Sequence, residues 1–262
     1  MYRQFLTSIW QHKRIIAVWT RYNIQANLLN TKLGMIWLVL YPLLMTLVYS
    51  FLFSFLLNRS PRGGVPFIAF FLSGMIVWIF FNNSLFRSTT LIVQNANLIE
   101  QVQFPRETLI YVFVGEQAVD FSVSFVILLV LSFISGYYPT WAYIYIPPIL
   151  LTLFLMVLGS VFILATLGLF VRDIPKVLNL ILRFLFYGSG IIFPADVLPP
   201  KALEILVFNP VFFLVESFRN ILFYAETPDL LSLVIWFFLS VFVAFIGFSI
   251  FKAKSGVFAD YR

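Results

Sequence analysis

The longest stretch of this chain without a charged side chain runs from Phe121 to Val171, 51 residues that include no Asp, Glu, Lys or Arg. Most of these residues are apolar, and only the segment 136–141, with Gly, Pro and paired Tyr residues, is typical of a turn. A water-soluble domain cannot bury so many consecutive apolar residues, whereas a bilayer accepts them as two helices joined by a hairpin. The pattern therefore predicts an integral membrane protein.

Further windows without charge recur along the chain, and each approaches or exceeds the ~20 apolar residues that cross the hydrocarbon core of a bilayer. They predict six transmembrane helices, with spans at about 35–57, 66–86, 108–135, 143–171, 176–193 and 230–251. We therefore expect an all-α transmembrane domain over residues 35–262. Because six is an even number, both termini are expected on the same side of the membrane.

Residues 1–34 differ from the rest, since they carry five basic and no acidic residues. Phe5, Ile9 and Ile16 recur at helical spacing, and polar residues such as Gln11 and Arg14 fill the opposite face. This pattern predicts an amphipathic helix that lies in the cytoplasmic interface of the membrane before the first span. The helix is either a simple anchor that fixes the topology or a gate that contacts a partner.

The segment 194–229, between the fifth and sixth predicted spans, contains five of the chain's prolines. Its two apolar pieces, 202–208 and 211–224, are too short or too interrupted to span, so we expect re-entrant or interfacial helices on the external side. Glu216 and Arg219 are three residues apart on one helical face, which predicts that they pair with each other.

The distribution of Lys and Arg predicts the orientation. With both termini in the cytoplasm, the inner side carries 13 of the 17 basic residues and the outer side carries four. Cytoplasmic loops of membrane proteins are enriched in Lys and Arg, so the prediction is N-in and C-in. The net charge of +6 then reflects the membrane topology and does not indicate binding to nucleic acid.

The cytoplasmic segment 95–107 is longer than a connector between two spans requires. It contains a short helix-compatible stretch that ends before Pro105, because proline disfavours a helical residue in front of it. Its mixture of Leu, Ile, Glu and Phe suits a small helix that docks into a groove of another protein.

Composition excludes several kinds of chemistry. The chain has no cysteine, and His12 is its only histidine, so thiolate or histidine metal centres and Ser-His triads are excluded. No glycine is followed by lysine, which excludes a phosphate-binding loop of the G-x-x-x-x-G-K-[ST] type. We expect no metal, no catalytic residue and no cofactor on this chain. If ATP drives transport, a separate polypeptide must hydrolyse it.

Glu116 and Asp120 lie four residues apart on one face of the third predicted span. Ionisable groups at membrane depth are costly and face protein or water, so this pair could form a proton or cation site of a carrier. Simple hydration near the cytoplasmic end is the alternative that we favour. Arg183 in the fifth predicted span offers a partner for one of the two carboxylates.

A series of short motifs resembles the ABC-2-type permeases that export surface polysaccharides. The series is Arg21-Tyr22, Leu33-Gly34-Met35-Ile36-Trp37 with Tyr41-Pro42, Asn97-Leu98-Ile99 with Phe104-Pro105-Arg106-Glu107, Arg172-Asp173-Ile174, Ile192-Phe193-Pro194 with Leu198-Pro199, and Asn209-Pro210. The resemblance covers nearly the whole chain, with the motifs in family order.

The resemblance implies a homodimer of six-helix subunits in the bacterial inner membrane, bound to two copies of an ABC ATPase that carries ATP and Mg. The implied substrate is a polyprenyl-diphosphate-linked glycan, such as an O-antigen for lipopolysaccharide, a capsular polysaccharide or a teichoic acid precursor.

The resemblance also implies roles for particular residues. The loop that couples to the ATPase comprises Asn97, Leu98, Ile99, Glu100, Phe104, Pro105, Arg106 and Glu107. Arg172 and Asp173 form a second cytoplasmic contact. Arg21, Tyr22 and Lys32 form a gate that meets the lipid headgroup. Candidates for the substrate path are Trp37, Tyr41, Trp78 and Tyr187.

Three other functions compete with polysaccharide export. An ABC-2 exporter of a lipid or drug shares the same topology. A membrane-embedded enzyme acting on polyprenyl-linked sugars requires paired acidic residues in an external loop, a spacing that Asp196, Glu204 and Glu216 do not show. A carrier or channel independent of ATP would use Glu116 and Asp120.

Overall fold

The computed structural model describes residues 2–29, 34, 36–56, 62–192, 195 and 199–258. These residues contain helices and no strand. The longer helices are α1 (Tyr2–Leu29), α2 (Ile36–Leu56), α3 (Phe67–Gln94), α5 (Glu107–Ile134), α6 (Ile146–Phe170) and α10 (Leu230–Lys254). The shorter ones are α4 (Ala96–Gln101), α7 (Ile174–Tyr187), α8 (Pro200–Leu206), α9 (Pro210–Phe223) and the 3-10 turns η1 (Arg62–Gly64), η2 (Trp141–Tyr145) and η4 (Ser255–Val257).

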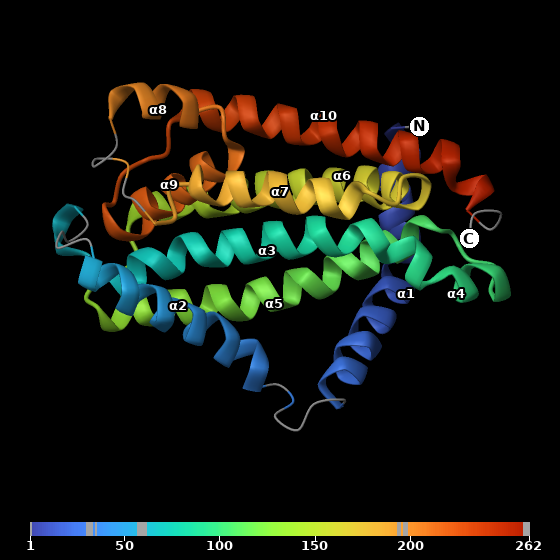
Figure 1. Cartoon of the computed structure of the whole chain (residues 1–262), viewed down its shortest axis with the longest axis horizontal. Coiled ribbons are helices and arrows are strands. Elements are labelled where there is room, and N and C mark those ends of the chain that lie inside the picture. The colour runs from blue at the N-terminus through green and yellow to red at the C-terminus, as the bar shows by residue number, and fades with distance from the viewer. Residues whose placement is uncertain are drawn as a thin grey trace.

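The bundle consists of α3, α5, α6, α7 and α10, which run along one long direction (Figure 1). Helix α6 packs extensively against both α10 and α3, while α2 leans against α3 and diverges from the bundle. Helix α1 crosses one end of the bundle at a steep angle and packs on α5 (Figure 1). We call this end, where α4 and the C-terminal part of α10 also lie, the α4 end; the opposite end holds α8, α9 and η1 and is the α8 end.

Four helical segments are long and apolar enough to cross a membrane: 67–94, 107–134, 141–170 and 230–257. The bent pair α8 and α9, whose axes meet at 107°, would make a fifth if it counted as one span. The all-helical membrane architecture is thus confirmed, but the predicted number of six spans is not. Helix α7 has only 14 residues, and α3 continues to Gln94, two turns beyond the predicted end of its span.

Small residues allow the central helices to approach closely. A Cβ atom on Gly159 of α6 would lie 2.5 Å from the backbone nitrogen of Ala244 in α10, and one on Gly168 would lie 1.9 Å from the carbonyl oxygen of Thr89 in α3. Neither position can therefore hold a larger residue without separating the helices. Close backbone contact through small residues is the usual way in which membrane helices gain packing energy.

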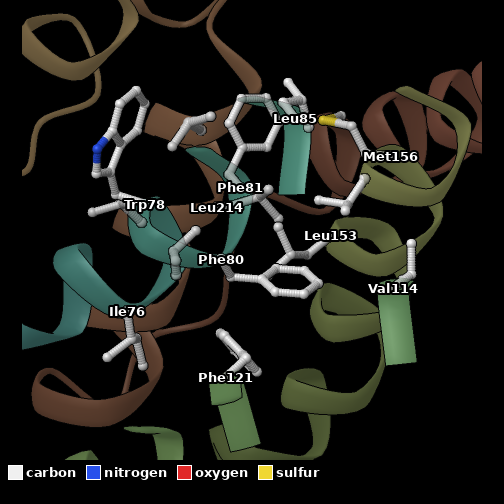
Figure 2. Packing of buried hydrophobic residues seen from close by; sticks show 14 of the residues in the cluster. Ile76, Trp78, Phe80, Phe81, Leu85, Val114, Phe121, Leu153, Met156 and Leu214 are labelled. Atoms are coloured by element: carbon white, nitrogen blue, oxygen red, sulfur yellow. The ribbon is translucent and has the colours of Figure 1, made fainter. Parts of the chain in front are cut away.

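Aromatic side chains fill the remaining space at the centre of the bundle. Phe80 of α3 lies 5.2 Å from Phe121 of α5 and 4.9 Å from Phe154 of α6, measured between ring centroids. Figure 2 shows Phe80, Phe121 and Leu153 facing one another where the three helices meet. The Phe-rich composition of the chain is thus explained in large part by packing within the bundle.

A single buried arginine joins three segments at the α8 end. Arg219 of α9 is fully buried, and its guanidinium forms an ion pair with Glu216, with Nη1 and Oε1 2.6 Å apart. The predicted pair is therefore confirmed. The other acceptors of the guanidinium are the carbonyl oxygens of Gly190, Ile191 and Phe70 and the hydroxyl of Ser73, at 2.6, 3.1, 3.3 and 3.4 Å.

All five N–H donors of Arg219 thus have an acceptor, which is the full capacity of a guanidinium. The plane also stacks on the Phe70 ring, 3.5 Å from its centroid. Gly74 leaves room for it, because a Cβ there would lie only 3.1 Å from Nη2 of Arg219. This cluster holds α9 against α3 and against the residues that follow α7.

The connection to α10 lies at the same end and is exposed. Asp229 accepts hydrogen bonds from the backbone nitrogen and hydroxyl of Ser232 and so caps α10, and these bonds hold the pKa of Asp229 below its usual value. Glu226 pairs with Arg62 of η1 at 3.0 Å, with both side chains largely in solvent. Such an exposed pair contributes little to stability.

We expect Arg219→Met to destabilise the protein strongly, because it leaves the Glu216 carboxylate and the carbonyl oxygens of Gly190 and Ile191 without the donors that Arg219 supplies. Removing one partner of a buried ion pair costs about 3–5 kcal/mol. Arg219→Lys should recover only part of this loss, since an ammonium offers three donors in place of five. Thermal unfolding in detergent, followed by tryptophan fluorescence, measures the effect.

Arg62→Met is the matched control, because it removes an arginine from an exposed ion pair at the same end. Its cost should be about 0–1 kcal/mol. Equal shifts in the unfolding temperature for Arg62→Met and Arg219→Met would show that the buried cluster does not stabilise the fold in the way proposed.

Candidate functional site

The segment between α3 and α5 projects from the α4 end. The Asn95 amide donates to the Leu91 carbonyl at 2.9 Å and so terminates α3, and α4 follows directly. Within α4, Ile99 is buried against the bundle, while Asn97 and Glu100 are exposed. Val102 just beyond α4 is an apolar side chain that is 49% exposed. The predicted coupling loop thus presents a mixed polar and apolar surface on a helix anchored by Ile99.

The second half of this loop contacts two distant parts of the chain. Phe104 packs edge-on against Trp19 of α1, with ring centroids 5.4 Å apart. The Arg106 guanidinium lies 5.9 Å from the ring centroid of Phe258, just after α10. A movement of this loop would therefore reach both α1 and the C-terminal segment.

The loop ends in an ion pair that sequence reasoning missed. Glu107, in the first turn of α5, accepts from Lys252 Nζ at 2.7 Å, and the Glu107 side chain is only 6% exposed. A carboxylate in a first helical turn and a lysine in the last turn of α10 also complement the two helix dipoles. Since 145 residues separate the partners, no local spacing could reveal this contact.

The predicted second contact, Arg172 and Asp173, lies in the exposed connection between α6 and α7. Asp173 pairs with Lys176 across an exposed helical turn at 3.0 Å. The Lys254 ammonium, 5.9 Å from the Phe170 ring centroid, places the end of α6 beside the end of α10. The structure therefore brings this predicted contact to the same end of the bundle as the coupling loop.

The predicted gate residues have different surroundings. Arg21 and Tyr22 are exposed on α1, whereas Lys32 lies outside the described residues. The neighbouring Asn23 turns toward α5 and donates to Glu116 Oε1 at 2.6 Å. Helix α1 thus presents an exposed face with Arg21 and is attached to α5 by its other face.

Glu116 and Asp120 share a face of α5 as predicted, but they line different cavities. Glu116 lies with Asn23 and Arg87 in a polar cavity between α1, α3 and α5. Asp120 lies in a second cavity that α2 helps to form. Arg183 of α7 forms an ion pair with neither carboxylate among the described residues, so the suggested partnership is wrong; Arg183 instead lines a groove on another side of α3.

This groove, between α2, α3 and α7, brings together three of the four predicted substrate-path residues. Tyr41, Trp78 and Tyr187 line a volume of about 420 Å³. Trp37 and Tyr41 line the adjoining cavity of about 190 Å³, which contains Asp120. Both volumes include Asn83.

The groove also contains residues that the sequence did not single out: Asn82, Asn83, Asn179 and Phe186. For the three asparagines, an amide side chain within a mostly apolar helix is the sequence signal that could have identified them. Trp78 is packed against Phe186 at 5.3 Å and is largely buried, so it forms the wall of the groove more than its open surface. The lining thus combines aromatic rings and neutral amides with the guanidinium of Arg183.

Comparison with known proteins gives a consistent result along the chain. The family model described as ABC-2 type transporter matches residues 14–223. An O-antigen export system permease protein of Klebsiella pneumoniae is 27% identical over 94% of both chains, and one of Myxococcus xanthus is 25% identical over 98% of both. A polysialic acid transport protein of Escherichia coli is 24% identical over 85% of this chain and 86% of its own.

The matched region includes most of α1, the predicted coupling loop, the groove helices and the Arg219 cluster. This chain belongs to the ABC-2 type transporter family of membrane proteins.

Proposed function

We propose that this chain is the membrane permease subunit of an ATP-driven exporter that moves lipid-linked polysaccharide, of O-antigen or capsule type, across the bacterial inner membrane. The observation that carries the proposal is the match over nearly the full length to O-antigen export permeases and to a polysialic acid transport protein. The groove supports it, because aromatic rings, amides and the Arg183 guanidinium offer the apolar faces and hydrogen-bonding groups that suit a sugar chain better than a purely apolar drug.

The proposed topology has six crossings with both termini in the cytoplasm. Helix α2, with 21 residues and no charged side chain, supplies one crossing in addition to the four long spans. Helix α7 and the residues after it supply the other, while α8 and α9 form a re-entrant external element. The basic residues at the α4 end support placing that end in the cytoplasm.

The proposed complex is a homodimer of this chain bound to two copies of a separate ABC ATPase, which carries ATP and Mg. Exposed residues of α4 and Val102 would dock on the ATPase, with Arg172 and Asp173 as a second contact. The docking movement would pass through Phe104 to α1 and through Glu107 to α10.

The proposed substrate is a polyprenyl-diphosphate-linked glycan that enters from the cytoplasmic side. Arg21 and Lys32 would meet its diphosphate, since charge-assisted hydrogen bonds to basic side chains favour this anion. Tyr22 would lie beside the headgroup at the membrane interface, where tyrosine is favoured. The glycan would then follow the groove along Tyr41, Trp78 and Tyr187.

Gentle purification tests the proposed function. The tagged protein from its native host, solubilised in mild detergent, should bring with it an equal amount of an ATPase containing a phosphate-binding loop, identified by mass spectrometry. Deleting the gene should remove surface polysaccharide. Purification of the protein alone from several mild detergents, with surface polysaccharide unchanged in the deletion strain, would refute the proposal.

Phe104→Ala should uncouple ATP hydrolysis from export, because it removes the contact between the coupling loop and α1. An edge-on aromatic pair contributes about 0.5–1.5 kcal/mol, so we expect export to fall about three- to tenfold. ATPase binding and hydrolysis in the purified complex should persist. Tyr138→Ala, which removes an exposed aromatic ring at the α8 end, is the matched control. Normal export by Phe104→Ala would mean that the loop is only a connector.

The ion pair between Glu107 and Lys252 permits a charge-exchange test. Lys252→Glu alone should place two carboxylates side by side and lower both the unfolding temperature and export. The double variant Glu107→Lys with Lys252→Glu should recover much of both, because the attraction is restored with exchanged signs. Leaving a buried carboxylate without its donor costs about 1–3 kcal/mol. If the double variant is as defective as the single one, the pair does not link α5 to α10.

A further inference from the structure

The cavity that contains Asp120 differs from the groove beside it. It lies between α2, α3 and α5 and has a volume of about 190 Å³, far more than a single water molecule needs. Trp37 and Tyr41 of α2 line one side. Asn83 of α3 and Gln117 and Asp120 of α5 line the other sides. Aromatic faces and polar side chains thus converge on one small space.

Two of these polar side chains have unused hydrogen-bonding capacity. Gln117 is only 4% exposed, yet its amide has no hydrogen bond among the residues that the structure describes. Among the same residues, the Asp120 carboxylate also has neither a hydrogen bond nor an ion pair. Asp120 is half-buried and Gln117 is buried, and both line the cavity, so their polar atoms are available to a molecule bound there.

The lining indicates the chemistry of that partner. Among the described residues that line the cavity there is no Lys, Arg or His, so this lining is not adapted to an anion. Within the described ranges no group of three acidic or histidine residues could hold a metal ion. This lining suits a neutral molecule that both donates and accepts hydrogen bonds and has an apolar face. A sugar ring has these properties, since its hydroxyls do both and its C–H groups pack on aromatic rings.

We propose that this cavity is a sugar subsite beside the export groove, an inference that rests on the proposed function. Asp120 accepts hydroxyl hydrogens, the amides of Gln117 and Asn83 donate and accept, and Trp37 and Tyr41 cover the apolar face of the ring. The cavity and the groove share Tyr41, Ile79 and Asn83, so a glycan in the groove can place one ring in the subsite. This assigns Asp120 a role in recognising hydroxyls instead of carrying protons.

Photocrosslinking in living cells tests the subsite against the native lipid-linked glycan. A p-benzoylphenylalanine at position 79 reports on the junction of the cavity and the groove, and one at position 45 reports on the groove alone. We expect both to capture glycan, detected as a carbohydrate-stained band shift. Asp120→Leu should lower capture at position 79 and export about tenfold or more, because hydrogen bonds to a charged group contribute about 1.5–3 kcal/mol. Capture at position 45 should persist.

Asp120→Asn separates this role from proton transport. An amide still bonds to hydroxyls, so we expect Asn to retain export within about threefold, in line with the modest net strength of a single hydrogen bond. A proton or cation carrier would lose transport equally with Asn and Leu, and that result would overturn the subsite. Ser122→Ala on the exposed side of α5 is the control, and unfolding temperatures verify that each variant is folded.

The two proposals fail in different ways. Capture at position 45 together with undiminished capture at position 79 in Asp120→Leu would overturn the subsite and leave the export function intact. No glycan at either position, with normal surface polysaccharide in a strain that lacks this chain, would overturn both.

Discussion

The buried guanidinium of Arg219 is the interaction on which the rest of the α8 end depends. Removing a charge from water is costly, and here the cost is offset by an ion pair with Glu216 and by four further hydrogen bonds. Three of those bonds go to backbone carbonyls, so they fix the positions of two chain segments whatever their side chains are. Because these segments belong to α3 and follow α7, Arg219 also sets the spacing between two walls of the groove.

The α4 end is organised by a different principle. There Gly168 of α6 lies directly against Thr89 of α3, and midway along the bundle Gly159 lies against Ala244 of α10, so these three helices form a tightly packed unit. The coupling loop is attached to this unit through Glu107 and to the crossing helix α1 through Phe104. A movement of the loop would therefore act both on the tightly packed unit of α3, α6 and α10 and on α1, which lies across the end of the bundle.

Hydrophobic patterning was sufficient to predict the long helices, because lipid imposes a length that soluble proteins do not share. It did not show how far α3 continues beyond its predicted span, since the helix extends past Arg87 to Gln94. The pairing of Glu216 with Arg219 was predictable from helical spacing, whereas the carbonyl acceptors and Lys252 were not. Those contacts join residues that are 28 to 149 positions apart in the sequence. The periodicity of apolar and polar residues along one helix contains no information about such distant contacts.

The mixed lining of the groove fits what the proposed export of long chains requires. A path that binds each sugar strongly would hold the chain in place, while a path without polar groups would exclude its hydroxyls. Aromatic rings with asparagine amides avoid both extremes, because each contact is weak and neighbouring contacts are similar. In the proposed subsite, the Asp120 carboxylate would add selectivity for hydroxyl groups at one position beside the path. The weak contacts along the groove would meanwhile leave the chain free to advance.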